Sequence, residues 1–262
     1  MKNIKSRGDL WFHLLTDGGL TLPNLSASVR AAEKDGVIYL AVVPDPENIY
    51  PRARHGEVGL IEGWTLSKII HETILKDKNV KRPIVVIVDV TSQAYGRREE
   101  AFGIHQSLAA AAGAYAQARL EGHPVVALIV GKAMSGAFLA NGYQANELIA
   151  FDDSAVMIHA MGKESAARIT LRTVEELDRF AAKIPPMAYD IKHFASLGLL
   201  NGLLHIEDPD APNEDDVELV KASIAGAIKK AKKDGINLKN RFSSKNRAAS
   251  VEVRRRMKEI WK

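Results

Sequence analysis

PVVALIVGKAMSGAFLANGYQANELIAFDDSAVMIHAMG, from Pro124 to Gly162, is the stretch that decides the fold. It opens with the unbroken apolar run Val125–Val130, which has a proline before it and Gly131 after it. A short continuous apolar run with such flanks is typical of a strand that is buried on both faces. We expect this strand to end at Gly131, where a tight turn leads into a helix.

Ser135 and Gly136 stand where that turn enters the predicted helix. At a helix start the backbone N–H groups lack partners and the helix dipole is positive. Two more short strands are expected at 147–151 and 155–159, and the second ends in His159. A serine, a glycine and a histidine are therefore expected to meet at strand ends, a composition typical of a site that stabilises a developing oxyanion.

A second apolar run, Pro83–Val90, predicts another buried strand. It leads into the polar segment Thr91–Gly96, and ligands of open α/β sheets bind just past the carboxyl ends of strands. With a first strand at Val37–Val43 and an alanine-rich helix at about Glu99–Leu120, strands and helices alternate along the chain. This order predicts right-handed crossovers and an α/β fold class, with a buried, mostly parallel sheet and flanking helices.

Less regular segments surround these elements. Residues 1–35 predict a weakly amphipathic start and a loop, and residues 50–59 predict a plain surface loop. After the histidine we expect helices at 163–170, 174–182 and 185–197, a short strand at 203–206, a linker at 208–212, a long helix at 216–233 and a basic tail. The chain is accordingly divided into a main domain, residues 1–210, and a helical basic extension, residues 211–262.

The composition limits the class of protein. The 262 residues are 46% hydrophobic and 26% charged, which suits one large α/β domain or two small ones. Cysteine is absent, which excludes disulfides, zinc-thiolate sites and thiol nucleophiles, and no metal site is predicted. We find no signal-peptide pattern and no apolar run near the roughly 18–20 residues of a membrane span. A cytoplasmic protein without a membrane partner is expected.

Positive charge collects at the C-terminal end. Residues 229–262 carry 13 Lys and Arg against 3 Asp and Glu, whereas the net charge of the whole chain is only +4. Such a tail fits an acidic or phosphate-bearing partner, and it equally fits a solvated or subunit-docking helix. Aromatic side chains do not interleave the basic ones as in a nucleic-acid platform, so a nucleic-acid partner is not expected.

Several separated blocks resemble a known family. They are Thr91–Tyr95 followed by Glu99-Glu100, then VVALIVGKAMSGAFLANGY, PDPENIYPRARHGEVGLIEGW, VMIHAMGKESAARITLRTVEEL and IPPMAYDIKHFASLGLL. The first two are similar to the carboxyltransferase subunits of acyl-CoA carboxylases. Together the blocks, within residues 37–206, resemble the gamma subunit of biotin-independent malonate decarboxylase. The resemblance implies the crotonase-like ββα spiral fold.

The resemblance also implies partners and a reaction. Gamma subunits of this family pair with a beta subunit of the same fold, and an acyl carrier protein delivers a malonyl thioester on a phosphoribosyl-dephospho-CoA arm. The pair removes CO2 to leave an acetyl thioester, and a separate transferase subunit exchanges acetyl for malonyl. No cofactor is expected on this chain itself.

Loss of CO2 from a malonyl thioester develops negative charge on the thioester oxygen, which two preorganised N–H donors would stabilise. The resemblance places one donor at Gly136 and the other in the strand-end loop at Gln93 or Ala94. Carboxyltransferase relatives carry a glycine where Gln93 stands. Protonation of C2 is expected from His159, or from a water or Ser135 near it. We expect further substrate contacts from Ala137, Ala160 and Met161.

Each of the central residues also has a structural explanation. Gly136 would permit close packing of helix on strand, Ser135 would cap the helix, and His159 would lie in the core with a backbone carbonyl as partner. A crotonase-like subunit can also serve mainly to complete the active site of its partner. A non-catalytic scaffold subunit is therefore one alternative.

The Clp serine peptidases, which share the superfamily, supply a second alternative. Their nucleophile lies in a Gly-x-Ala-x-Ser-x-Gly-Ala-Phe turn, and their base histidine follows Met-Ile. Residues 131–138 read Gly-Lys-Ala-Met-Ser-Gly-Ala-Phe, one residue short after the serine, and Asp190 is the nearby acid that could orient His159. A triad without its orienting acid is much weakened, so we rank the peptidase below the decarboxylase.

The sequence also bears on three other reactions. A carboxyltransferase subunit that passes the carboxyl group to biotin remains an alternative. Hydration of an enoyl thioester is disfavoured, because Met161 stands where crotonase hydratases carry a glutamate. A conventional serine esterase is disfavoured too, because positions 133–137 do not form the Gly-x-Ser-x-Gly motif.

Overall fold

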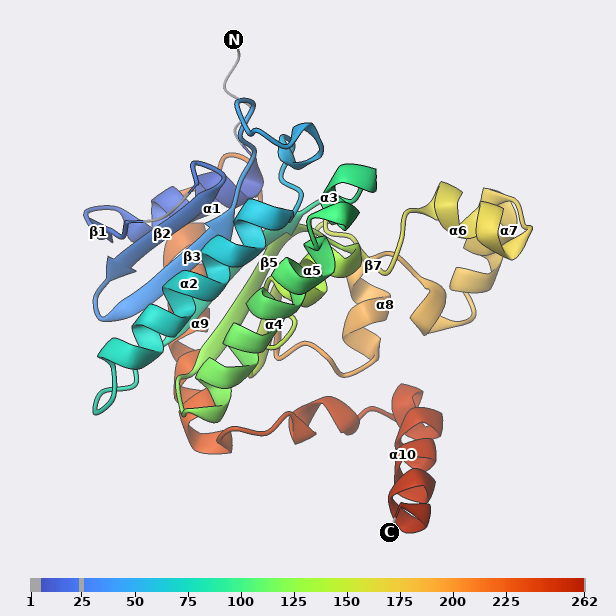
Figure 1. Ribbon diagram of the computed structural model, residues 1–262. Coiled ribbons are helices and arrows are strands. Elements are labelled where there is room, and N and C mark those ends of the chain that lie inside the picture. The colour runs from blue at the N-terminus through green and yellow to red at the C-terminus, as the bar shows by residue number, and fades with distance from the viewer. Residues whose placement is uncertain (1–5, 24–25, 262) are drawn as a thin grey trace.

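The computed structural model describes residues 6–23 and 26–261. Within these ranges one sheet of eight strands forms the centre, in the order β1-β2-β3-β4-β5-β6-β8, with β7 paired to β5 (Figure 1). The strands are β1 (Leu20–Thr21), β2 (Val29–Lys34), β3 (Val37–Val42), β4 (Ile84–Val90), β5 (Val125–Met134), β6 (Glu147–Phe151), β7 (Ile158–His159) and β8 (Gly202–Leu204). From β3 onward the pairing is parallel, whereas β1, β2 and β3 pair antiparallel. The predicted α/β class with a mostly parallel sheet is confirmed.

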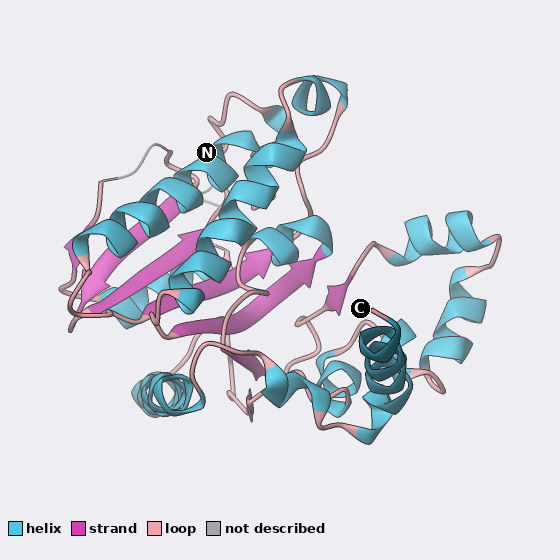
Figure 2. Cartoon of the chain, turned by 60° about the horizontal axis from the view of Figure 1, so that its bottom comes forward, coloured by secondary structure: helices cyan, strands magenta, loops and turns pink. Residues whose placement is uncertain are grey.

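Helices cover both faces of the sheet. Figures 1 and 2 show α2 and α4 side by side on one face and α1 and α9 on the other. The helices are α1 (Arg7–Thr16), α2 (Leu60–Lys76), α3 (Arg97–Ala101), α4 (Ile104–Leu120), α5 (Ser135–Ala140), α6 (Lys163–Thr170), α7 (Val174–Ala181), α8 (Ile191–Ser196), α9 (Glu214–Asp234) and α10 (Ala248–Ile260). In Figure 1, α6 and α7 extend outward beyond β7.

The two apolar runs form the middle of this sandwich, as predicted. Every residue of Ile84–Val88 in β4 and of Val125–Val130 in β5 has an exposed fraction of 0%. Helices on both faces shield these strands, which explains why they lack polar alternation. Because full burial of a Val, Leu or Ile side chain contributes about 1.5–3 kcal/mol, the two strands are a main source of the stability of the core.

The weakly amphipathic start predicted for the N-terminal region is the helix α1, but the prediction of a loop after it was wrong. Residues 7–34 form α1, β1 and β2, so β3 is the third strand of the chain rather than the first. Asp35 and Gly36 connect β2 to β3 with φ values of 50° and 73°, the two-residue hairpin turn that Asp-Gly favours. Residues 1–5, 24 and 25 of the predicted segment lie outside the described residues.

Gly131 does not end its strand as predicted, because β5 continues to Met134. The glycine instead makes room for Asp89 of β4: a Cβ on residue 131 would lie 2.7 Å from Asp89 Cγ. Asp89 accepts hydrogen bonds from the N–H groups of Gly8 (3.0 Å) and Lys132 (3.1 Å). One carboxylate therefore ties α1, β4 and β5 together.

We expect Gly131→Ala to lower the free energy of unfolding by about 1–3 kcal/mol, because Asp89 is fixed by two hydrogen bonds and cannot give way to the new methyl group. Chemical denaturation followed by circular dichroism measures the change. Gly113→Ala, in an exposed position of α4 with no atom within 4 Å of the added Cβ, is the matched control. It should raise the free energy of unfolding by about 0.5–1 kcal/mol, and an equal effect of the two substitutions would contradict the role of Asp89.

Other predicted boundaries shift for local reasons. The helix expected at about Glu99–Leu120 is divided into α3 and α4, because Gly103 between them has a φ of 80°. The helix expected at 185–197 begins as a 3-10 turn at Pro185–Met187, and α8 starts only after Asp190, which caps it. The strands expected at 155–159 and 203–206 are the shorter β7 and β8.

The two helices of the C-terminal extension differ in their packing. α9 buries Val220 and Ile224 in the main core beside β5 and β6, whereas α10 has no buried residue. The division at residue 211 stays a prediction, and the change in packing comes after α9. In the part of the chain that the structure describes, no helix is long and apolar enough to cross a membrane.

Candidate active site

The turn from β5 into α5 holds Ser135 in an uncommon backbone conformation. Its φ is +64°, in the left-handed region that costs a residue with a side chain about 1–2 kcal/mol. Ser135 and Gly136 open the helix, as predicted. The turn is sharp enough to direct the hydroxyl of one residue and the N–H of the next toward a common point.

That common point is the side-chain oxygen of Gln93. Gly136 N–H donates to Gln93 Oε1 at 2.8 Å, and the hydroxyl of Ser135 donates to the same oxygen. A Cβ on Gly136 would lie 3.2 Å from Gln93 Oε1, so the glycine also permits this approach. Two donors from one turn thus converge on one amide carbonyl oxygen.

The loop after β4 presents Gln93 because a second segment holds it. Val58 N–H donates to Ser92 O at 3.0 Å, and Ala94 N–H donates to Val58 O at 2.9 Å. Residues 50–59 were predicted as a plain surface loop, and this pairing is a role that the prediction missed. The Ala94 N–H is therefore occupied by Val58 O, whereas the Ser135 hydroxyl lies beside the Gly136 N–H as a second donor to the Gln93 oxygen. The second donor expected at Gln93 or Ala94 stays a prediction.

His159 lies next to the same turn. β7 continues the sheet beside the end of β5, with His159 opposite Met134. The imidazole stacks on Tyr189, with ring centroids 3.8 Å apart, and its Nδ1 lies 3.1 Å from Met161 O. Burial lowers the pKa of His159 below its ordinary value, which favours the neutral imidazole at pH 7. Met161 N–H also lies 3.3 Å from Nδ1, so Nδ1 either donates to Met161 O or accepts from Met161 N–H, and Nε2 has no hydrogen-bond partner among the described residues.

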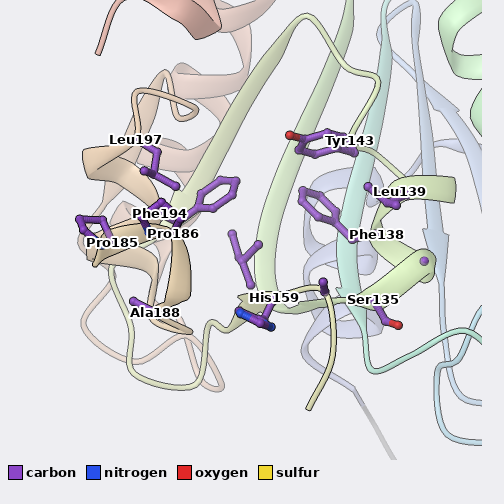
Figure 3. A pocket seen from close by; sticks show the side chains of 13 residues that line it. Ser135, Phe138, Leu139, Tyr143, His159, Pro185, Pro186, Ala188, Phe194 and Leu197 are labelled. Atoms are coloured by element: carbon purple, nitrogen blue, oxygen red, sulfur yellow. The ribbon is translucent and has the colours of Figure 1, made fainter. Parts of the chain in front are cut away.

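A cavity of about 310 Å³ opens beside these groups. Its walls are mainly apolar, and its lining residues are Ser135, Gly136, Phe138, Leu139, Tyr143, Ile158, His159, Ala160, Pro185, Pro186, Ala188, Phe194 and Leu197. Figure 3 shows Ser135 and His159 at one end of the cavity and Tyr143 at the other. The wall from residues 185–197 was not predicted as part of the site; its Pro-Pro pair and the aromatic Phe194 were the available signal.

The structure separates the predicted substrate contacts. Ala160 lines the cavity, beside His159. Ala137 is fully buried in the main core, and Met161 packs against a small cluster formed by Ala166, Ala167 and Leu177. Ala137 and Met161 therefore do not line this cavity. α5 directs Ala137 toward the sheet, and Met161 packs against the cluster at α6 and α7.

The groups that a serine peptidase needs are not assembled here. Asp190 accepts from His193 N–H at 3.0 Å and lies 2.7 Å from His193 Nδ1, so it caps α8 instead of orienting His159. The hydroxyl of Ser135 donates to Gln93. Among the described residues there is also no group of three or more His, Asp and Glu side chains that could hold a metal ion.

Comparison with known proteins identifies the family. Residues 53–261 match the family model of the malonate decarboxylase gamma subunit, MdcE. The chain is 54% identical to a chain of a Pseudomonas malonate decarboxylase hetero-tetramer crystallised with coenzyme A, with a TM-score of 0.93 over 98% of this chain and 100% of that chain. A Pseudomonas MdcD–MdcE hetero-dimer gives 53% identity and a TM-score of 0.89 over the same shares.

More distant relatives extend the comparison. The chain is 36% identical over 164 residues to the malonyl-S-ACP:biotin-protein carboxyltransferase MADD of Malonomonas rubra, which covers 61% of this chain and 56% of that protein. It thus spans about half the length of that curated relative. A transcarboxylase 12S structure, at 20% identity and a TM-score of 0.62 over 84% of this chain and 40% of that chain, shares the fold. The predicted crotonase-like fold is confirmed, and the chain belongs to the malonate decarboxylase gamma-subunit family.

Proposed function

We propose that this chain pairs with a homologous beta subunit and that the pair decarboxylates a malonyl thioester to an acetyl thioester and CO2. The observation that supports this most is the convergence of the Gly136 N–H and the Ser135 hydroxyl on one carbonyl oxygen. Gln93 Oε1 is an amide oxygen, and it stands in for the thioester oxygen of the substrate. The hetero-tetramer and hetero-dimer of the Pseudomonas relatives support action as part of a complex.

The chemistry follows from where charge develops. When the bond between C2 and the carboxylate breaks, its electron pair moves toward the thioester carbonyl and forms an enolate. Donors that lie about 2.7–3.1 Å from that oxygen stabilise the enolate more than the neutral thioester, and each contributes about 10²–10³ in rate. The apolar cavity excludes water from the carboxylate, which favours loss of uncharged CO2. A proton must then reach C2.

His159 is the group that we assign to this proton transfer. It lines the cavity, and its Nε2 is not used by the bond that Nδ1 makes to Met161. Because burial lowers its pKa, the imidazolium is scarce at pH 7 but is a strong acid when it forms. A neutral His159 can also position the water that delivers the proton.

The pH profile tests this role. The imidazolium fraction of His159 rises as pH falls toward its lowered pKa, so kcat of the complex should rise between pH 8 and pH 6 wherever protonation limits the rate. His159→Gln should flatten this profile and lower kcat by about 10² or more, because water replaces the acid. His205→Gln, at an exposed position, is the control and should keep the wild-type profile. A wild-type slope in His159→Gln would rule the assignment out.

Two further components belong to the proposal. An acyl carrier protein with a phosphoribosyl-dephospho-CoA arm presents the malonyl group, and a transferase subunit exchanges acetyl for malonyl, as the family resemblance implies.

Transfer of the carboxyl group to a biotin protein is the second candidate, supported by the 36% identity to MADD. The match of residues 53–261 to the gamma-subunit family favours release of CO2.

The deciding experiment mixes the full chain with its beta-type partner and a malonyl thioester labelled in the free carboxyl group. Release of labelled CO2 that needs both subunits supports the proposal. Label that leaves the thioester only when a biotin carrier protein is added, and is recovered on the carrier, replaces it with carboxyl transfer. No release, together with labelling of Ser135 by a fluorophosphonate, would replace it with peptidase chemistry.

A further inference from the structure

A second cavity, of about 440 Å³, is lined by an excess of positive charge. Its cationic lining residues are Arg119, Lys239, Arg241, Arg247 and Arg254, and the remaining ones are Tyr143, Leu199, Leu238 and Phe242. No carboxylate is among the lining residues, and none of the five cations has an ion-pair partner in the described part of the chain. By contrast, Arg255 and Arg256, beside Arg254 on α10, both pair with Glu252.

Two of these cations are buried as well as unpaired. Arg119 and Arg241 have exposed fractions of 9% and 6%. Arg119 donates to Gln144 O and Ile236 O, and Arg241 donates to Tyr143 O and Ala145 O, so their hydrogen bonds go to neutral carbonyls. A buried charge without an opposite charge is costly, because neutral groups offset only part of its lost hydration.

The pKa of Arg241 is lowered by burial and by this excess of positive charge. Burial, together with the charges of Arg119 and Arg247, lowers the pKa of Arg241 to about 10. Glu147 is the acid whose charge reaches Arg241, and it is itself paired with Lys230 at 2.8 Å. The Nε atoms of Arg241 and Arg247 are buried and have no hydrogen-bond partner among the described residues.

We infer that this cavity is a binding site for a phosphoryl anion, either free or carried on the arm of a substrate. Guanidinium groups match the geometry of phosphate oxygens by paired hydrogen bonds, and a diphosphate brings enough negative charge for several of them. A single carboxylate would offset only one of five charges. The five cations line one open cavity, and Arg254 also lines a neighbouring cavity with Arg255 and Lys258.

The position of the cavity relates it to the candidate active site. Tyr143 lines both cavities, and in Figure 3 it lies at the end opposite Ser135 and His159. A phosphoryl group bound by the arginines would therefore sit beyond that end, and a flexible arm attached to it would run toward the catalytic turn. This link to the substrate arm rests on the proposed function, whereas the anion site itself does not.

Calorimetric titration of the full chain with inorganic pyrophosphate tests the site. We expect saturable binding of one pyrophosphate and a higher midpoint of thermal unfolding. Arg247→Gln and Arg254→Gln each remove one charge without touching the carbonyl bonds of Arg119 and Arg241, and each should weaken binding about tenfold. Arg256→Gln removes the same charge from an exposed residue outside the cavity, and it should change the affinity less than about twofold.

Titration with coenzyme A distinguishes an arm-borne phosphoryl group from a free anion. Coenzyme A that competes with pyrophosphate and binds more tightly supports an arm-borne phosphoryl group, and coenzyme A of equal or lower affinity supports a free anion. No saturable binding, or equal weakening by Arg256→Gln, would overturn the inference. It would also be overturned if the cavity variants bound pyrophosphate normally and lost only their pairing with the beta subunit. Each readout is independent of CO2 release, so failure of the proposed function would be recognised separately.

Discussion

Ser135→Ala should lower kcat of the assembled complex by about 10²–10³, because it deletes one of the two donors that meet at the position proposed for the thioester oxygen. KM should change much less, because the hydroxyl binds the enolate more strongly than it binds the uncharged thioester. Steady-state release of CO2 from a malonyl thioester by the wild-type and variant complexes measures both constants.

Ser135→Gly separates this chemical role from the strain in the turn. Glycine adopts the φ of +64° without the steric cost, so this variant should raise the free energy of unfolding by about 1 kcal/mol relative to Ser135→Ala. It lacks the hydroxyl, however, and should lose as much activity. Wild-type turnover in either variant would remove Ser135 from the donor pair and leave Gly136 alone.

The sequence predicted those parts of the fold that local pattern determines. Val125–Val130 is apolar without a break, and only a strand with helices on both faces can bury such a run, so its position and burial followed directly. The hairpin at Asp35-Gly36 was missed although its turn signal was present, because the preceding strand β2 is short, alanine-containing and partly polar. Gly131 was misassigned because what it accommodates, Asp89, comes from a strand 42 positions earlier.

The candidate site, like the fold, was predicted where local sequence determines it and was missed where distant residues meet. Ser135, Gly136 and His159 were predicted together, because the two strand ends that carry them are set by neighbouring apolar runs, and all three line one cavity. Ala94 could not be judged from the sequence, because its N–H is taken by Val58, a residue of a distant loop. The basic cavity was equally hidden: Arg119 ends α4, while Arg241, Arg247 and Arg254 come from the C-terminal extension, and only folding brings them together.

Gln93 is expected to compete with the substrate for the Gly136 N–H and the Ser135 hydroxyl. Its amide oxygen accepts from the two donors that the proposed mechanism assigns to the substrate, so in that mechanism the thioester must displace it before the reaction can begin. A neutral hydrogen bond contributes about 0.5–1.5 kcal/mol, so losing two of them at displacement costs about 1–3 kcal/mol of apparent binding energy. Gln93→Ala should accordingly lower KM about five- to 140-fold, with little change in kcat.

Gln93→Glu should have the opposite effect on kcat/KM. A carboxylate accepts from the Gly136 N–H and the Ser135 hydroxyl about twice as strongly as an amide does, so it would hold the donors against a neutral thioester. We expect kcat/KM to fall about 10- to 100-fold, measured as CO2 release at limiting substrate. The two substitutions therefore predict opposite signs at one position. If both substitutions lowered kcat/KM, Gln93 would instead be a group that the reaction requires. Removal of a side chain that only blocks the donors cannot lower kcat/KM.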